Sequence, residues 1–206
     1  MPAPLFRIAD GLERLSDPVL STLARIVFAA VLLRYYWASG LTKLGDGITG
    51  ILSPSVGGYA QIFPRAMEAV GFNTGEMSWL HWAVVVAGTL AEFILPLLIV
   101  VGLLTRLAAL GMIGFVVMQS LTDVVGHGAD AATIGAWFDR ASGALILDQR
   151  AFWVLALLVL VFKGAGPLSL DRLWFRNAPW VRPVFRQRGP ERRLVLPSRW
   201  GTSWPR

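Results

Sequence analysis

Four apolar stretches constrain the fold of this 206-residue chain more than any other feature of its sequence. They are residues 20–42, 82–104, 107–125 and 151–162. A helix needs about 20 apolar residues to cross a bilayer, and the first three stretches have that length. The fourth needs Gln149 or Arg150 at one end and residues from 163–170 at the other. The sequence therefore predicts an all-α, polytopic membrane protein with a bundle of four transmembrane helices.

The composition excludes several other classes of protein. Hydrophobic residues make up 55% of the chain and charged residues only 16%, and there is no cysteine. Soluble domains carry about 25% charged residues. This balance excludes a disordered chain, a collagen and a coiled coil. The lack of cysteine excludes a disulfide scaffold, a cysteine-ligated metal site and thiol catalysis.

The distribution of basic residues predicts the orientation of the bundle. They lie before the first span, in the turn between the second and third spans, and after the fourth span: Arg7, Arg14, Arg106 and nine arginines within residues 164–206. The two long loops, residues 44–80 and 126–150, carry more acidic than basic residues. Since basic residues are retained on the cytoplasmic side, we expect both termini in the cytoplasm and both long loops outside. The expected location is a bacterial-type inner membrane.

Three segments are predicted along the chain. Residues 1–19 combine leucine and isoleucine at helical spacing with charged residues, which is typical of an amphipathic helix on the inner membrane surface. Residues 20–174 form the four-span domain. Residues 175–206 form a basic tail rich in Trp and Arg, whose expected contacts are anionic lipid headgroups rather than nucleic acid.

Two charged residues lie near the middle of the predicted spans, Arg34 in the first and Glu92 in the second. Counted at 1.5 Å per residue, both residues fall close to the middle of the bilayer, slightly toward its outer side and at nearly the same depth. An unpaired charge at that depth costs at least about 2.5–3.5 kcal/mol. The sequence therefore predicts a buried Arg34–Glu92 pair. It leaves two interpretations open: a structural pin that fixes helix register, or a site where Glu92 exchanges protons or faces a quinone.

Pro96 follows Glu92 by four residues. The proline ring removes the N–H that would bond the backbone carbonyl of Glu92. We therefore expect a kink at Pro96 and a free carbonyl beside the Glu92 carboxylate. Such a combination can bind water or a polar ligand, although an ordinary packed kink is the commoner outcome.

A second polar cluster is predicted at the outer mouth of the bundle. Its members are Tyr36, Lys43, His81, Asp123 and His127. Two histidines and an aspartate are possible metal ligands. However, the histidines belong to different spans, and glycines flank His127 where the third helix should end. No metal is therefore expected. Aromatic residues near this mouth could stack on a quinone ring or form an ordinary interfacial belt.

Three short motifs at the ends of spans and one residue in the middle of a span form a recognisable set. They are residues 39–43 (SGLTK), Glu92, residues 102–106 (GLLTR) and residues 164–171 (GAGPLSLD). In this order they resemble the DoxX family of small four-helix membrane proteins, over roughly residues 25–174. The long basic tail and the size of the two outer loops depart from the family pattern.

The resemblance implies architecture more closely than chemistry. Members of the DoxX family occur as membrane subunits of thiosulfate:quinone oxidoreductases and quinol oxidases, beside oxidative-stress proteins, and beside peptide systems that handle copper. We therefore expect an accessory subunit of a quinone-linked redox system, in which a protein partner carries the redox cofactor. Glu92 is the candidate catalytic residue and quinone the candidate cofactor. The alternatives are a non-catalytic scaffold or biogenesis partner, and a small transporter for a metal or a sulfur species.

Overall fold

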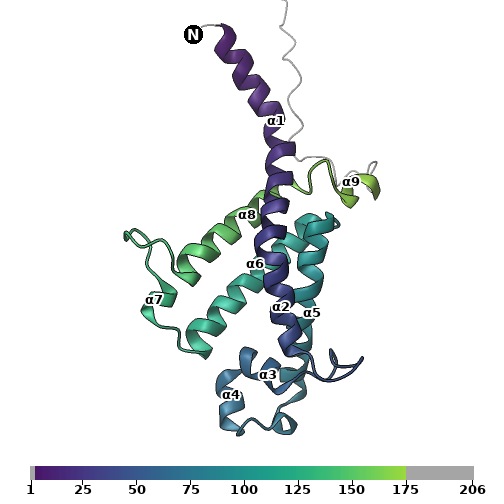
Figure 1. Cartoon of the computed structure of the whole chain (residues 1–206), viewed down its shortest axis with the longest axis vertical. Coiled ribbons are helices and arrows are strands. Elements are labelled where there is room, and N and C mark those ends of the chain that lie inside the picture. The colour runs from purple at the N-terminus through teal and green to yellow at the C-terminus, as the bar shows by residue number, and fades with distance from the viewer. Residues whose placement is uncertain (1–2, 175–206) are drawn as a thin grey trace, which may run out of the picture.

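The computed structural model describes residues 3–174, and all regular structure in this part of the chain is helical (Figure 1). Four helical stretches are long and apolar enough to cross a membrane: Gly11–Lys43, Trp79–Val101, Thr105–Gly126 and Leu145–Lys163. The predicted all-α fold with four transmembrane helices is confirmed. The basic tail predicted at residues 175–206 lies outside the described residues.

The first span is one long helix with a local change of pitch. It consists of α1 (Ala3–Phe28), the π-helical turn η1 (Ala29–Leu33) and α2 (Arg34–Lys43). The helix does not break at the boundary predicted between residues 19 and 20, so the predicted surface helix and the first span are continuous. Figure 1 shows the N-terminal part of α1 projecting beyond the other helices. The side chains of residues 1–10 and of Arg14 lie outside the described set.

The second and third spans form an antiparallel hairpin. They are α5 (Trp79–Val101) and α6 (Thr105–Leu121), which is extended by the π-helical turn η3 (Thr122–Gly126). The chain reverses over only three residues. Gly102 ends α5 with a φ of 72°, a left-handed conformation that glycine adopts without steric cost. The N–H groups of Gly102 and Leu103 both bond the carbonyl of Leu98, which closes α5.

The fourth span gains its missing length on one side only. It consists of the π-helical turn η4 (Leu145–Gln149) and α8 (Arg150–Lys163). Gly164 then stops the helix with a φ of 81°. The expectation that the span also draws on residues beyond Lys163 is wrong, because the chain turns at Gly164 and a separate short helix, α9 (Leu170–Trp174), follows.

The two long loops carry short helices of their own. The first loop contains α3 (Val56–Ile62), α4 (Pro64–Ala69) and the 3₁₀ turn η2 (Thr74–Glu76), and the second contains α7 (Ala131–Ile134). Figure 1 shows α3 and α4 at the far end of the molecule from the N-terminus and α9. The helix α3 packs against α2 and α5, so this loop covers one end of the bundle.

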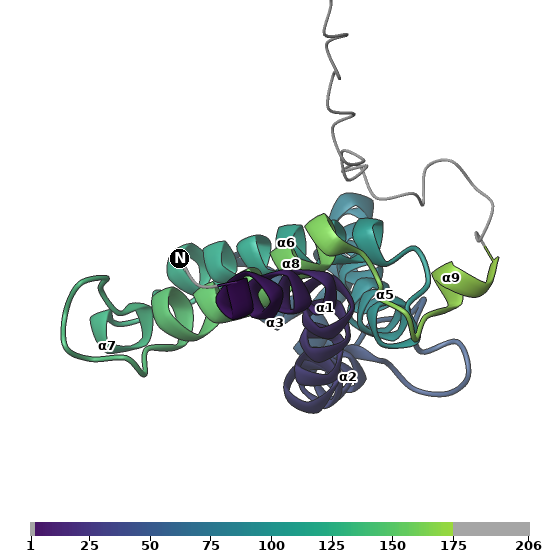
Figure 2. The same cartoon turned by 90° about the horizontal axis from the view of Figure 1, so that it is seen from above.

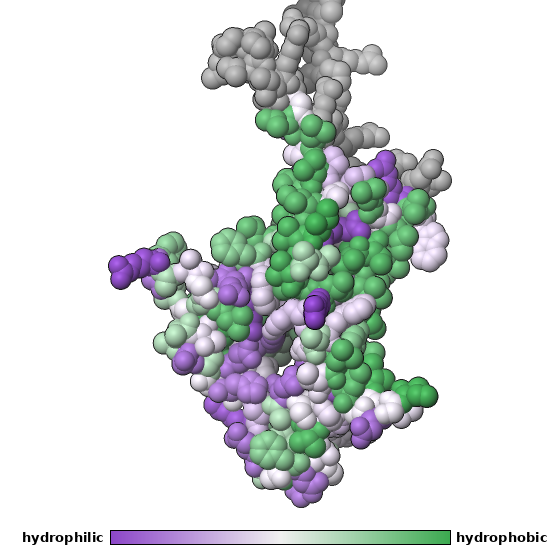
Figure 3. Space-filling model, viewed as in Figure 1, coloured by the Kyte–Doolittle hydropathy of each residue, from purple (hydrophilic) through white to green (hydrophobic). Residues whose placement is uncertain are grey.

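A continuous core joins the four spans. Seen from above, α6 and α8 run side by side (Figure 2); α1 packs on α8, and α5 packs on α6. Ala108 and Ala109 face the core, where their small side chains allow close approach of the helices. The other buried core residues are Ala24, Phe28, Leu32, Tyr36, Ile99, Met112, Val116, Leu157 and Leu160. Large apolar side chains also cover much of the outer surface of the spans, as expected for a lipid-facing bundle (Figure 3).

Candidate functional site

The strongest polar site inside the bundle joins Lys43, Ser39 and Glu92. The Lys43 ammonium lies 3.0 Å from both carboxylate oxygens of Glu92. It also donates to the Ser39 hydroxyl at 2.7 Å, and that hydroxyl donates to Glu92 Oε1 at 2.9 Å. The three side chains form a closed network, in which the ammonium donates its hydrogen bonds to Glu92 and Ser39. This network is referred to below as the Lys43–Glu92 site.

The Lys43–Glu92 site is sealed from solvent. The side chains of Lys43 and Glu92 are only 5% and 4% exposed. Helix α3 covers the Lys43 end, because Gly58 lies so close to the Lys43 backbone that an added Cβ would stand 3.0 Å from the Lys43 carbonyl oxygen. Ser55, the N-cap of α3, donates its N–H to the same carbonyl. The loop between the first two spans therefore closes the site at this end of the bundle.

Burial strengthens the attraction between the two charges of the site but also removes their hydration. In a low-dielectric interior, a lone ammonium or carboxylate is strongly disfavoured unless a partner neutralises it. Here each charge has the other as its partner, and Ser39 satisfies further hydrogen-bonding capacity. The arrangement can hold a proton donor and a proton acceptor 3.0 Å apart inside the bundle.

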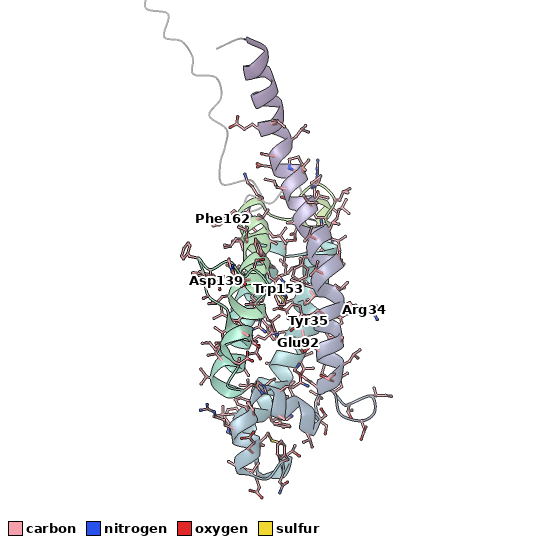
Figure 4. All side chains as sticks on the ribbon, turned by 60° about the vertical axis from the view of Figure 1, so that its left-hand side comes forward. Arg34, Tyr35, Glu92, Asp139, Trp153 and Phe162 are labelled. Carbon is pink, nitrogen blue, oxygen red and sulfur yellow. The ribbon has the colours of Figure 1, made fainter. Side chains whose placement is uncertain are left out.

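The predicted Arg34–Glu92 pair is wrong. Arg34 is exposed and points away from the bundle, whereas Glu92 points inward (Figure 4). The two residues have similar depths, but depth does not determine the direction in which a side chain points. Arg34 and Lys43 are nine residues apart in α2, and at about 100° per residue they lie on opposite faces of the helix. Since Lys43 faces Glu92, Arg34 faces outward.

The predicted outer-mouth cluster does not form as a unit. Its members make separate contacts, each with a partner outside the cluster. Tyr36 donates to Gln119 at 3.4 Å, Lys43 pairs with Glu92, His81 contacts Ser78 at 2.8 Å, Asp123 pairs with Arg150 at 2.5 Å, and His127 Nε2 lies 3.0 Å from the Gln61 carbonyl. Among the described residues there is no group of three or more histidine, aspartate or glutamate side chains that could hold a metal ion.

The cluster separates because its members serve the ends of different helices. His81 is the third residue of α5 and forms a capping box with the N-cap Ser78, whose N–H it accepts. Asp123 neutralises Arg150, which is 3% exposed at the start of α8 and also donates to Ser120. The sequence does not indicate Arg150 as a partner of Asp123, because Arg150 lies at the flank of the predicted fourth span, 27 residues away.

Pro96 is fully buried within α5, which remains a continuous helix around it. The proline leaves the backbone carbonyl of Glu92 without its usual helical donor. The nearby Thr89 hydroxyl donates to the Val85 carbonyl at 2.8 Å, not to Glu92. The predicted free carbonyl next to the Glu92 carboxylate follows from the ring chemistry, and the kink stays a prediction.

Aromatic residues gather one helical turn from Ser39. Tyr35 and Tyr36 of α2 pack edge-to-face, with ring centroids 5.0 Å apart. Trp153 of α8 lies 5.5 Å from Tyr35, and Phe115 of α6 lies 5.7 Å from Tyr36. Figure 4 shows Tyr35, Trp153 and Glu92 at similar heights in the bundle. Of the aromatic residues predicted at the mouth, the two tyrosines join α2 to α6 and α8.

A second polar network lies at the opposite end of the bundle, around Arg25. This residue is 9% exposed and donates to four backbone carbonyls. Two belong to the end of α5, Ile99 at 3.0 Å and Val100 at 2.5 Å. The others belong to the segment after α8, Ala165 at 2.9 Å and Leu168. Arg25 therefore satisfies carbonyls that a helix end and a turn leave without donors.

Asp171 completes this network from the other side. Its carboxylate accepts the N–H groups of Leu104 at 2.6 Å and Thr105 at 2.9 Å, which caps the start of α6. Its own N–H donates to the Gly102 carbonyl. The GLLTR and GAGPLSLD motifs noted in the sequence thus meet in space. The sequence suggested neither contact, because the partners are more than 60 residues apart.

Comparison with known proteins identifies the family. The DoxX family profile matches residues 20–128, which include the first three spans and both members of the Lys43–Glu92 site. The fourth span and the GAGPLSLD motif lie beyond the matched residues. No curated protein and no solved structure matches the chain significantly. With more than half of its length matched and four membrane-spanning helices, the chain is a multi-pass membrane protein that belongs to the DoxX family.

Proposed function

We propose that this protein is an accessory subunit of a quinone-linked redox system in a bacterial-type inner membrane, with both termini in the cytoplasm. A protein partner carries the redox cofactor. The Lys43–Glu92 site exchanges protons during the redox cycle of the quinone. The observation that carries this proposal is a lysine and a glutamate that pair with each other while both are buried between two membrane spans.

The chemistry of quinones supports this role for an ion pair. Reduction of a quinone to its quinol takes up two electrons and two protons, and oxidation releases them. The partner exchanges the electrons, so the membrane subunit needs only groups that give and take protons. Ionisable residues within membrane spans commonly form such relays. The rings of Tyr35 and Trp153, near the same height, offer flat apolar surfaces against which a quinone ring can stack, and the buried Tyr36 packs against both.

The test measures quinone-linked activity in membranes from the native host. Glu92→Gln keeps the shape and most hydrogen bonding of the side chain but cannot ionise. A proton role predicts that this variant inserts and folds but loses at least about 90% of the activity, because general acid–base groups contribute about 10²–10⁴-fold. Asp17→Asn is the matched control, since it neutralises one acidic member of the exposed Asp17–Lys163 pair. Full activity in a folded Glu92→Gln variant would show that the pair has only a structural role, and it would refute the proposal.

A second function, a scaffold for other proteins, is favoured by the outer loop that carries α7. Trp137 and Phe138 are 63% and 104% exposed, and Phe138 adopts a φ of 67° that is unusual for a large residue. Adjacent exposed aromatic residues are typical anchors of protein interfaces. Purification in mild detergent tests this function. Loss of a co-purifying protein in Trp137→Ser with Phe138→Ser, but not in Glu92→Gln, would favour the scaffold.

A further inference from the structure

An open pocket of about 650 Å³ lies at the end of the bundle where α6 begins and α8 ends. It is separate from the Lys43–Glu92 site, which lies at the opposite end of the bundle, where α2 ends at Lys43. Its walls come from α1, from the first residues of α6, and from the segment that follows α8. The lining residues with a role below are Asp17, Thr105, Arg106, Lys163, Asp171 and Arg172.

The pocket has basic groups that its acidic groups do not neutralise. Lys163 pairs with Asp17 at 2.5 Å, and both oxygens of Asp171 accept backbone N–H groups of α6. The Arg106 guanidinium has one long hydrogen bond, 3.4 Å to the Phe162 carbonyl. Within residues 3–174, the Arg172 guanidinium has no hydrogen bond. Arg106 and Arg172 therefore present two planar groups to the pocket, and such groups bind phosphate through two parallel hydrogen bonds.

A buried hydroxyl in the pocket wall also lacks a partner. Thr105 is 1% exposed, and its Oγ1 has no hydrogen-bond partner among residues 3–174. Leaving a buried polar atom unsatisfied is unfavourable, so such atoms commonly mark a place where a ligand or water binds. Thr105 is the first residue of the 17-residue helix α6. The positive end of the helix dipole points toward the same region, where the Asp171 carboxylate already accepts the N–H groups of Leu104 and Thr105.

The rim of the pocket is apolar on the side that faces the membrane. Leu107, which lines the pocket, is 66% exposed. Phe162 precedes the lining residue Lys163 and is 70% exposed, and Figure 4 shows it on the outside of the bundle. A ligand held here would contact basic groups with one part and lipid-facing apolar surface with another. The basic tail, residues 175–206, is a poor occupant because it carries eight arginines and only one acidic residue.

We infer that this pocket binds the headgroup of an anionic phospholipid. Arg106 and Arg172 hold the phosphate, the Thr105 hydroxyl donates to a headgroup oxygen, and the acyl chains lie along Leu107 and Phe162. Basic pockets between transmembrane helices bind anionic lipid headgroups in other membrane proteins. The inference does not depend on the proposed redox function, because none of these residues touches Lys43 or Glu92.

The test measures lipid binding to the full chain in detergent by native mass spectrometry. The probes are phosphatidylglycerol, phosphatidylcholine and inorganic phosphate. We expect saturable binding of one phosphatidylglycerol, which Arg106→Gln with Arg172→Gln weakens at least about tenfold. Arg65→Gln with Arg140→Gln is the matched control, since it removes the same charge from exposed positions in the outer loops. Equal phosphatidylglycerol binding by the two double variants would refute the inference.

Thr105→Val gives a second and independent test. It keeps the shape of the side chain and removes the unpartnered hydroxyl. We expect the Tm of delipidated protein to rise slightly, and the increase in Tm on adding phosphatidylglycerol to become smaller. Displacement of the lipid by millimolar inorganic phosphate, or equal binding of phosphatidylcholine, would overturn the assignment to an anionic lipid.

Discussion

Breaking the Lys43–Glu92 pair should destabilise the bundle far more than breaking an exposed pair. In Lys43→Met the Glu92 carboxylate keeps only Ser39 as a side-chain partner, at 2.9 Å. Both charges are at least 95% buried, and removal of one partner from such a pair typically costs about 3–5 kcal/mol. For a chain of this size, 1 kcal/mol corresponds to about 2–4 °C in Tm. The expected decrease is therefore about 6–20 °C.

The assay is a double-mutant cycle in detergent, read by thermal unfolding. Lys43→Met with Glu92→Leu should be much more stable than the sum of the single variants predicts, because no lone charge remains in the core. Lys163→Gln with Asp17→Asn is the matched cycle at an exposed pair, where the coupling is about 0–1 kcal/mol. Arg34→Gln, at an exposed position, should change Tm little.

Two results would refute this reasoning. Single variants as stable as the wild type would show that Lys43 and Glu92 do not face each other in the membrane. Additive losses in the double variant would show that each residue acts through its own packing rather than through the pair.

The remaining predictions concern topology, capping and the tail. A reporter inserted near Asp139 should show an outside location and one fused after Trp174 a cytoplasmic one; an outside signal after Trp174 would contradict the proposed orientation. Asp171→Ala should lower stability by about 1–2 kcal/mol, since two N–H groups at the start of α6 lose their cap; an unchanged unfolding curve would argue against the cap. Deletion of residues 177–206 should leave inserted, folded protein and weaken salt-sensitive binding to anionic vesicles, whereas loss of all inserted protein would show that the tail is structural.

Hydropathy was sufficient to predict the four spans, because the cost of placing polar residues in lipid is local and can be read residue by residue. The hairpin between α5 and α6 was predictable for the same reason, since only a few residues separate two long apolar stretches. The prediction of the bounds of the fourth span was less accurate. Its extra turn comes from the π-helical residues Leu145–Gln149, which contain Asp148 and therefore do not look like membrane sequence.

The charged partners required information on helix rotation. The pairing of Arg34 with Glu92 used depth alone, although the stripe of Tyr36, Ser39 and Lys43 at helical spacing already marked the inward face of α2. Combining that stripe with depth would have directed the prediction to Lys43. The contacts of Arg25 and Asp171 were beyond this reasoning, because they join backbone groups of distant turns whose approach depends on how all four helices pack.

The contacts of Arg25 and Asp171 also bear on the order in which the protein assembles during synthesis. Ala165 follows Arg25 by 140 residues, and Asp171 follows Leu104 by 67. A growing chain is made from its N-terminus, so these bonds wait until the last span has left the ribosome. Before then, Arg25 has only the carbonyls of Ile99 and Val100, and α6 begins without its aspartate cap. A chain that stops just before residue 165 already contains all four spans but cannot close this end of the bundle. It would therefore present uncapped backbone that quality-control proteases in the membrane can recognise.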